Sequence, residues 1–287
     1  MGGIDRTVRR RYNETNLRRK ESTRMKITCL AENTAVCDAF GCEHGLSLFI
    51  ETDTHKILFD MGQTDLFAEN AGKLQIDLAE ADLAVLSHGH YDHGGGLAAF
   101  LERNHTAPVY LSRYAFEPHY NGTEKYIGLD VTLAGNPRLV FVENTVTIDS
   151  GLTLYTAEGR QKRYDLGSFG LRMLADGVSV PEDFRHEQYL LLEEKGRRIL
   201  ISGCSHQGVL DIVDWFRPDV LIGGFHFSKL PTDETLASYA RILDGYPTTY
   251  YTCHCTGTEQ YAFMEKYMRH LHYLAAGQQI RLEEESG

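Results

Sequence analysis

The stretch LAVLSHGHYDHGGGL, residues 83–97, contains three histidines and one aspartate within six positions. These residues are His88, His90, Asp92 and His93, and they follow an apolar run and precede three glycines. Imidazole and carboxylate side chains are the ligands that borderline divalent ions such as zinc prefer. An apolar strand that ends in a polar loop before a helix is a common location for functional groups in α/β proteins. The stretch therefore predicts a metal site at the end of a buried strand.

The spacing of these residues indicates two metal centres. His88 and His90 are two positions apart, so on an extended segment both side chains point to the same side. Asp92 and His93 come about one turn later and can reach a second ion. The glycines at 94–96 carry no side-chain bulk, so the backbone can turn tightly beside the ions. A solvent-exposed polar turn is the alternative interpretation, and four ligand side chains within six positions argue against it.

The rest of the chain alternates strand-like and helix-like segments. Residues 46–62 predict a hairpin, and residues 187–204 predict a second hairpin that turns at Lys195 and Gly196. Apolar residues at helical spacing predict helices at 64–75, 95–104, 208–216, 232–243 (with Thr232 as its N-cap) and 257–271. Residues 113–185 mix short β-like runs with loops and predict no definite arrangement.

These segments form two similar halves, each with hairpins followed by alternating strands and helices. Sheets that face each other on one side and carry helices on the other need long apolar strands, which both halves contain. We therefore expect an α/β protein with a four-layer αββα sandwich, formed by a single domain over residues 25–287.

Residues 1–24 differ in composition from the rest of the chain. They carry eight Lys or Arg and three Asp or Glu, a net charge of +5, so the remaining residues carry −11 − 5 = −16. We interpret them as a basic, disordered leader because they contain few apolar residues. A basic arm for nucleic acid or an anionic membrane is the alternative. The acidic body argues against a nucleic-acid groove, and no stretch approaches the ~18 apolar residues of a membrane span.

The six cysteines are Cys29, Cys37, Cys42, Cys204, Cys253 and Cys255. Because the sequence shows no secretory signal, we expect free thiols and a cytoplasmic location rather than a disulfide framework. Cys253 and Cys255 alternate with His254 on a predicted strand, so their side chains should point away from it and serve packing.

The H-x-H-x-D-H pattern of residues 88–93 resembles the signature of the metallo-β-lactamase superfamily, and the resemblance extends over residues 25–282. The segments that carry it further are ILFDMG (57–62), EHGLS (43–47), ISGCSHQG (201–208), IGGFHF (222–227) and HCTG (254–257). Together they are similar to the subgroup that includes the archaeal dihydropterin–ribofuranosylaminobenzene phosphate synthase and related bacterial metal-dependent hydrolases. The resemblance implies that Asp60 braces the metal loop.

The remaining ligands must come from the second half of the chain. His206 and His254 each follow an apolar strand and precede a small residue or a glycine turn. We expect a first ligand set of His88, His90 and His206, and a second ligand set of Asp92, His93 and His254. The resemblance implies a bridging aspartate where this chain has Cys204. That cysteine is either a near or bridging ligand, since thiolate binds zinc well, or a small buried residue.

Other polar residues have two interpretations each. His226 either orients substrate or acts as a general acid, or packs in a loop, and we favour function; His44 is a weaker candidate for substrate binding, and His186 is an alternative ligand. Arg160 and Arg163, with Lys162 and Arg172, either bind a phosphate or lie in a solvated loop. We assign the aromatic residues Tyr114, Phe116, Tyr120 and Tyr126 to packing rather than a pocket. We assign the remaining histidines to the surface or to packing: His55, His105, His119, His270 and His272.

Two divalent ions, most simply zinc, can hold a water between them and lower its pKa toward neutrality. We expect a dinuclear hydrolase that attacks a small ester, lactone or phosphoester with a metal-bound hydroxide, with Asp92 as both ligand and proton acceptor. The resemblance implies a synthase-like alternative, a transferase that joins an aromatic acid to a phosphoribosyl pyrophosphate. Di-iron redox members of the superfamily typically have a glutamate where this chain has His90, which disfavours a redox protein.

Overall fold

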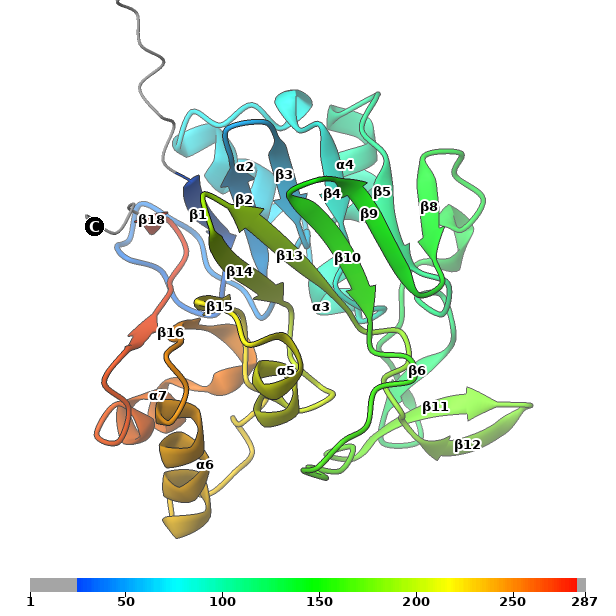
Figure 1. The fold of residues 1–287 in the computed structure, drawn as a ribbon. Coiled ribbons are helices and arrows are strands. Elements are labelled where there is room, and N and C mark those ends of the chain that lie inside the picture. The colour runs from blue at the N-terminus through cyan, green and yellow to red at the C-terminus, as the bar shows by residue number, and fades with distance from the viewer. Residues whose placement is uncertain (1–24, 283–287) are drawn as a thin grey trace, which may run out of the picture.

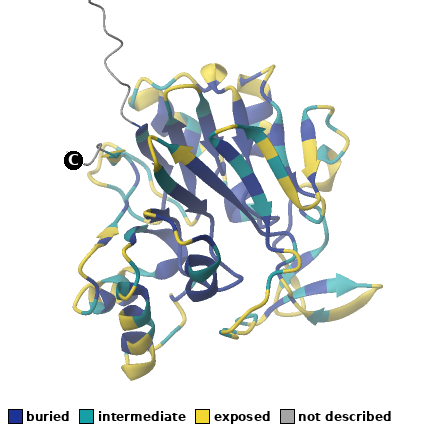
Figure 2. Ribbon diagram, viewed as in Figure 1, coloured by how far each residue is buried: buried dark blue, intermediate teal, exposed yellow. Residues whose placement is uncertain are grey.

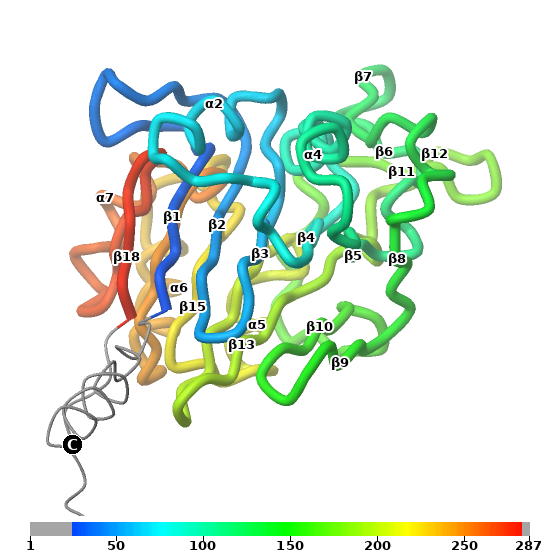
Figure 3. Tube along the Cα trace, turned by 90° about the horizontal axis from the view of Figure 1, so that it is seen from above, coloured from blue at the N-terminus to red at the C-terminus, as the bar shows by residue number. Residues whose placement is uncertain are grey.

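The computed structural model describes residues 25–282, so the predicted basic leader lies outside the described residues. Two large sheets lie face to face, and helices cover the outer face of each (Figures 1 and 3). The predicted four-layer αββα sandwich is therefore confirmed.

The first sheet has the strand order β18-β1-β2-β3-β4-β5-β8. Its strands are β1 (Met25–Ala31), β2 (Ser47–Glu51), β3 (Lys56–Phe59), β4 (Leu83–Val85), β5 (Val109–Ser112), β8 (Leu139–Val142) and β18 (Gln279–Leu282). The second sheet has the order β17-β16-β15-β14-β13-β10-β9. Its strands are β9 (Thr145–Asp149), β10 (Leu152–Thr156), β13 (Gln188–Glu194), β14 (Arg197–Ser202), β15 (Val220–Ile222), β16 (Thr249–Thr252) and β17 (Leu271–Tyr273).

The two sheets repeat one pairing pattern. From β1 to β8 in sheet order, two antiparallel pairings precede three parallel ones. The same succession runs from β10 to β17. Both predicted hairpins are confirmed, β2–β3 and β13–β14. The second turns at Lys195 and Gly196, whose φ angles of 53° and 78° are those of a tight hairpin turn that matches strand twist. Each half therefore brings parallel strand ends to one edge of its sheet.

The core has three layers because most strands are covered on both faces. Along β13, Leu190 and Leu192 pack between the sheets, whereas Tyr189 and Leu191 pack against the outer helices. Successive side chains of a strand point to opposite faces, which explains why this strand is continuously apolar. Figure 2 shows the buried residues along the strands and the inward faces of the helices.

The helices are α2 (Leu66–Lys73), α3 (Tyr91–Gly94), α4 (Leu97–Arg103), α5 (Val209–Phe216), α6 (Glu234–Asp244) and α7 (Thr258–Met264). Short 3₁₀ turns are η1 (Leu78–Glu80), η2 (Val131–Leu133) and η3 (His254–Thr256). The predicted cap of α6 is wrong by one residue, since Asp233 accepts a hydrogen bond from the Thr235 N–H at 2.8 Å. None of the helices within residues 25–282 is long and apolar enough to cross a membrane.

An inserted sheet occupies much of the segment for which the sequence predicted no arrangement. Its order is β12-β11-β6-β7, and its strands are β6 (His119–Asn121), β7 (Lys125–Tyr126), β11 (Leu171–Ala175) and β12 (Val178–Pro181). The β11–β12 hairpin projects from the sandwich beyond the ends of β10 and β13 (Figure 1). After β5 the chain forms β6 and β7 of this inserted sheet and then runs through β8, β9 and β10 of the two large sheets. It returns to the inserted sheet for β11 and β12 before it continues to β13.

Candidate metal centre

The candidate site lies where parallel strands of both sheets end. His88 follows β4, His206 follows β14, His226 follows β15 and His254 follows β16. The carboxyl ends of parallel strands meet at one edge, where α/β proteins place functional groups. His226 and His254 have left-handed backbones, with φ of 56° and 48°. Such strained conformations in non-glycine residues cluster at functional sites.

The structure brings the three residues of the first ligand set together. One nitrogen each of His88, His90 and His206 lies within 4.8 Å of the others, and all three residues are buried. Among the described residues, the His88 Nε2 and both ring nitrogens of His206 have no hydrogen-bond partner. Buried polar nitrogens without partners are costly, so the His88 Nε2 and one nitrogen of His206 fit a metal ion that accepts their lone pairs. The other His206 nitrogen carries the ring proton.

The second ligand set also converges. The His254 Nε2 lies 3.2 Å from the His93 Nε2 and 3.3 Å from the Asp92 Oδ2. In each of these two rings, the outer nitrogen, which faces away from the ligand set, makes a hydrogen bond. The His93 Nδ1 donates to the Asp60 Oδ2 at 2.6 Å, and the His254 Nδ1 donates to the Asn33 Oδ1 at 2.8 Å. Outer hydrogen bonds of this kind fix the ring and direct the other nitrogen to a metal.

Asp60 connects the two ligand sets. Its Oδ1 accepts from the Ser87 backbone N–H, and its Oδ2 accepts from the Ser87 hydroxyl, both at 2.7 Å. That hydroxyl in turn lies 2.8 Å from the His88 Nδ1, so it can accept that ring proton. One buried carboxylate thus orients His88 through a serine and His93 directly, which agrees with the bracing role that the resemblance implies.

Cys204 lies between the ligand sets. Its Sγ is 3.1 Å from the His93 Nε2 and within 4.8 Å of donor atoms of His88, His206 and His254. Burial raises the pKa of this thiol well above its usual value, so it is neutral unless a cation lies close. It thus lies between the two ligand sets, where the resemblance implies an aspartate.

Cys255 is closer to the site than the sequence predicted. The prediction that it points away from His254 is wrong, because β16 ends at Thr252 and residues 254–256 form a 3₁₀ turn instead of a strand. The Cys255 Sγ lies within 4.8 Å of the ligand atoms of Cys204 and His254. Cys253 does pack in the core between the two sheets.

The second ligand set favours positive charge. Burial would raise the pKa of Asp92, but hydrogen bonds from His254 and His44 hold it well below its usual value. Burial would lower the pKa of His93, but the charge and hydrogen bond of Asp60 raise it to about 9. A position that stabilises an imidazolium so strongly suits a divalent cation.

Two further predicted residues flank the ligand sets. His44, whose side chain is 55% exposed, lies with its Nε2 3.2 Å from the Asp92 Oδ2, at the solvent side of the second ligand set. His226 lies at the first, with its ring centroid 4.2 Å from that of His206. Phe169 contacts the His226 ring edge-on at 4.8 Å, and the buried His226 Nδ1 has no partner among the described residues.

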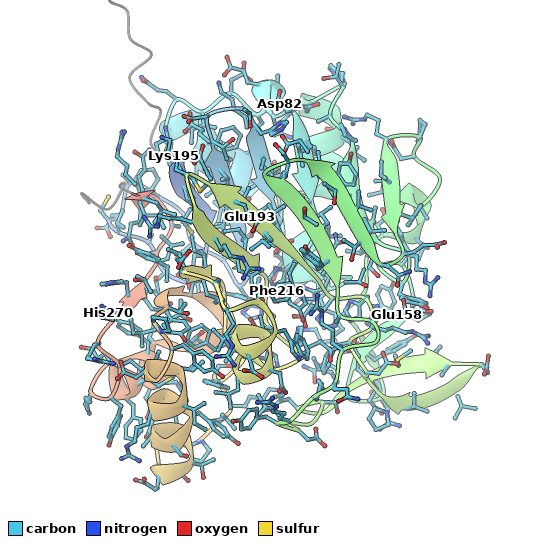
Figure 4. The ribbon with its side chains drawn as sticks, viewed as in Figure 1. Asp82, Glu158, Glu193, Lys195, Phe216 and His270 are labelled. Carbon is cyan, nitrogen blue, oxygen red and sulfur yellow. The ribbon has the colours of Figure 1, made fainter. Side chains whose placement is uncertain are left out.

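The arginines predicted for phosphate binding do not join the ligand sets. Arg160 lies over the ring of Phe216 at 4.4 Å (Phe216 is labelled in Figure 4), and Arg163 pairs with Asp214 at 3.0 Å. Both partners belong to α5, so these arginines contact the outer helix layer. Arg172 donates to Ser179 within the inserted sheet. Among the four aromatic residues of the same region, Tyr120 and Tyr126 contact each other with ring centroids 5.6 Å apart, and Phe116 packs partly buried against the outer core of the first sheet. Tyr126 is exposed, so its assignment to packing is wrong.

Sequence reasoning missed one buried group beside the site. Glu182 follows β12 and contacts His90, His119 and His186. The assignment of His119 to the surface or to ordinary packing is therefore wrong, because the inserted sheet brings it to this carboxylate. His186, the alternative ligand, contacts Glu182 and lies outside the first ligand set. Glu182 and His119 lie within the segment 113–185, for which the sequence predicted no arrangement, so no pattern connected them with the site.

Comparison with known proteins identifies the family of this chain. The family model of the metallo-beta-lactamase superfamily matches residues 40–244. The chain belongs to the metallo-beta-lactamase superfamily. It is 30% identical over 243 residues to the uncharacterized protein MJ0448 of Methanocaldococcus jannaschii, covering 80% of this chain and 90% of that protein.

Two further relatives of this superfamily cover most of the chain. The first is the 7,8-dihydropterin-6-methyl-4-(beta-D-ribofuranosyl)-aminobenzene-5'-phosphate synthase of Methanocaldococcus jannaschii, which is 29% identical over 287 residues, with 90% of this chain and 96% of the synthase covered. The second is the crystal structure of Tm1679, described as a metal-dependent hydrolase of the beta-lactamase superfamily. It superposes with a TM-score of 0.77 at 27% identity and covers 91% of this chain and 100% of that one. The chain therefore has the fold of the superfamily's metal-dependent hydrolases.

Proposed function

We propose that this protein is a dinuclear metal-dependent hydrolase of a small ester, lactone or phosphoester. The observation that carries the proposal is the convergence of two ligand sets at one edge, with partnerless nitrogens in the first and Cys204 between them. Histidine and carboxylate ligands favour zinc, and manganese or iron remain compatible with the same donors. When bound, two such ions lower the pKa of a water and polarise the electrophile.

Side chains of the site supply the proton transfers. Asp92 is held ionised by His44 and His254, so its carboxylate can accept the proton of the attacking water. His226 lies at the other ligand set, beside His206, and can donate a proton to the leaving oxygen. His44 is exposed enough to touch substrate as it enters. We keep Arg160 and Arg163 out of this account because their partners lie on α5.

The substrate class follows from the site's position and the protein's charge. The ligand residues are buried at one edge of the sandwich. The substrate must therefore be small, or must carry its reacting group on an extended substituent. The net charge of −11 disfavours nucleic acid as a partner.

All six cysteines are free, which fits a reducing cytoplasm.

Metal content measured together with turnover tests this function. Untagged protein purified without chelator should contain about two ions per chain by elemental mass analysis, as two complete ligand sets require. It should hydrolyse at least one of a phosphodiester, a thioester and a lactone. Chelator-treated protein is the control and should regain activity when zinc or manganese is restored. One ion or none would contradict the dinuclear site, and Cys204 would then be the residue to study.

A transferase is the second candidate, because the relative with 96% of its length covered is a synthase. In this reaction an aromatic acid would attack the sugar carbon of a phosphoribosyl pyrophosphate and diphosphate would leave. Protein with two ions and no hydrolysis should then release diphosphate only when both substrates are present. Diphosphate release without the aromatic acid would instead indicate hydrolysis.

A further inference from the structure

A third cluster of buried titratable residues lies beside the first ligand set. The Glu182 Oε1 is 2.6 Å from the His186 Nε2, 2.7 Å from the His119 Nδ1 and 3.1 Å from the His90 Nε2. The carboxylate side chain is fully buried. His119 approaches without hydrogen-bond alignment, so its contact is one of proximity. The cluster has the composition of a metal site. Whether it can bind an ion depends on which of its ring nitrogens carry a proton and which have a free lone pair.

Hydrogen bonding around His186 argues against a third ion. The Gly89 backbone N–H donates to the His186 Nδ1 at 2.7 Å, so that nitrogen presents its lone pair and carries no proton. In a neutral imidazole the other nitrogen then carries the proton. The His186 Nε2 therefore donates to Glu182 and has no lone pair for a metal. The cluster is a carboxylate that accepts hydrogen bonds.

The contact with His90 has a direct consequence for the first ligand set. The His90 Nε2 lies 3.1 Å and 3.2 Å from the two oxygens of Glu182. A carboxylate accepts, so this nitrogen must carry a proton. The lone pair of His90 is then on Nδ1, and Nδ1 is the atom that can bind an ion. Metal-binding histidines are commonly oriented by such an outer carboxylate.

The same short segment also supports His206. Gln207 donates from its Nε2 to the carbonyl oxygens of Asp183 and Phe184, at 2.9 Å and 3.0 Å. Phe184 stacks on the His206 ring with centroids 4.5 Å apart and planes 6° apart. Residues 182–186 therefore contact all three members of the first ligand set, since the ring centroid of His186 also lies 5.7 Å from that of His88. This segment connects β12 of the inserted sheet to β13 of the second sheet.

We propose that Glu182 is a positioning residue that fixes the Nε2–H tautomer of His90 and thereby couples the inserted sheet to the first metal ion. This inference rests on the proposed role of His90 as a ligand. Glu182 contacts neither substrate nor reacting atoms, so it acts through His90. His186 donates to the carboxylate from the segment before β13, and the His119 ring lies against it from β6.

The variant Glu182→Gln tests this proposal. Its amide keeps the size of the side chain but replaces one accepting oxygen by an NH₂ donor, which conflicts with the ring N–H groups of His90 and His186. We expect the affinity for the first ion to fall about 10–100-fold, with the second ion retained. Chelator competition measures each affinity. Asp183→Asn is the matched control, since it makes the same change of charge at the next, exposed residue.

A spectroscopic readout separates positioning from general support. Long-range ¹H–¹⁵N spectra of zinc-loaded, ¹⁵N-histidine-labelled protein should show His90 as the Nε2–H tautomer, and Glu182→Gln should change that signal. A His186→Gln variant provides a second route if Glu182→Gln does not fold. It retains an acceptor for the Gly89 N–H and a donor for Glu182, so it should keep both ions.

Three results would overturn the proposal. Unchanged affinity and unchanged His90 signals in Glu182→Gln would limit the residue to packing. A wild-type content of three ions that falls to two in that variant would make the cluster a metal site. Loss of the first ion in folded His186→Gln would show that His186 is itself a ligand. If the wild-type protein binds no ions at all, the proposed function fails first, and the two failures are thereby distinguished.

Discussion

At the candidate metal centre, three histidines are oriented by a hydrogen bond to the ring nitrogen that faces away from the ligand sets. Asp60, Asn33 and Glu182 accept from the outer nitrogens of His93, His254 and His90. Each partner comes from a segment far in sequence from the histidine that it orients. The inner nitrogens are thus fixed by contacts that the H-x-H-x-D-H pattern does not contain.

Removing one ligand from each set should separate the two ions. We expect His206→Ala and His254→Ala each to lower the metal content by about one ion per chain, because each leaves its set with two ligands and the other set intact. Elemental mass analysis measures the loss. His105→Ala, at an exposed position, is the control and should change nothing. Full metal content in both ligand variants would contradict the assignment.

Cys204 distinguishes the two interpretations that the sequence left open. If the thiol is a ligand between the ions, Cys204→Ser should weaken the second ion by about tenfold or more, ~1.4 kcal/mol, and Cys204→Asp should restore or raise its affinity. If it is only a small buried residue, serine should leave the metal content unchanged. A buried aspartate without a cation should then lower the thermal midpoint. Measurements of metal content and of the thermal midpoint in both variants distinguish the ligand from the small buried residue.

At the scale of single elements, sequence periodicity predicted the parts that depend on local pattern. The hairpin turn at Lys195 and Gly196 and the helices near 66–73 and 209–216 follow from alternation, helical spacing and glycine. The inserted sheet did not follow, because its strands are short and pair with segments distant in sequence, as β6 does with β11. Glu182 and His119 belong to that region, so the missing sheet and the missing part of the site have one cause.

The turn after β15 requires glycine. Gly223 has φ of 148°, and a Cβ there would lie 1.6 Å from the Ser202 carbonyl oxygen at the end of β14. Gly223→Ala must push apart two central parallel strands whose ends carry His206 and His226. We expect it to lower the free energy of unfolding by more than about 2 kcal/mol, from strain and overpacking together.

Urea unfolding measures this cost, and Gly122→Ala is its control. Gly122 also has a positive φ, 66°, but nothing lies within 4 Å of its Cβ position. The free energy of unfolding of that variant should therefore fall by only about 1 kcal/mol, the cost of a left-handed backbone at alanine. Equal losses in the two variants would mean that the close approach of β14 and β15 relaxes easily.

Across the whole molecule, the ligand sets join the two halves of the sandwich. The first half supplies residues 88–93 and the second supplies His206 and His254, and both sheets share the apolar core that includes Ile50 and Leu190. The overall fold was predictable because both halves repeat one order of strands. The sequence predicted only in part that ligands from both halves form one site. That part follows from the rule that the carboxyl ends of parallel strands meet at one edge of a sheet.

Metal removal should accordingly destabilise the whole protein. Ions that bind only the folded chain stabilise it by ~4 kcal/mol at a free concentration a thousandfold above the dissociation constant. For a chain of this size, removal should lower the thermal midpoint by roughly 10 °C. Differential scanning calorimetry of zinc-loaded and chelator-treated protein at constant pH measures the difference. The variant with both His206→Ala and His254→Ala should melt at one temperature with or without chelator. Equal midpoints in loaded and stripped wild-type protein would mean that the core alone holds the two halves together and that the ions serve chemistry without supporting the fold.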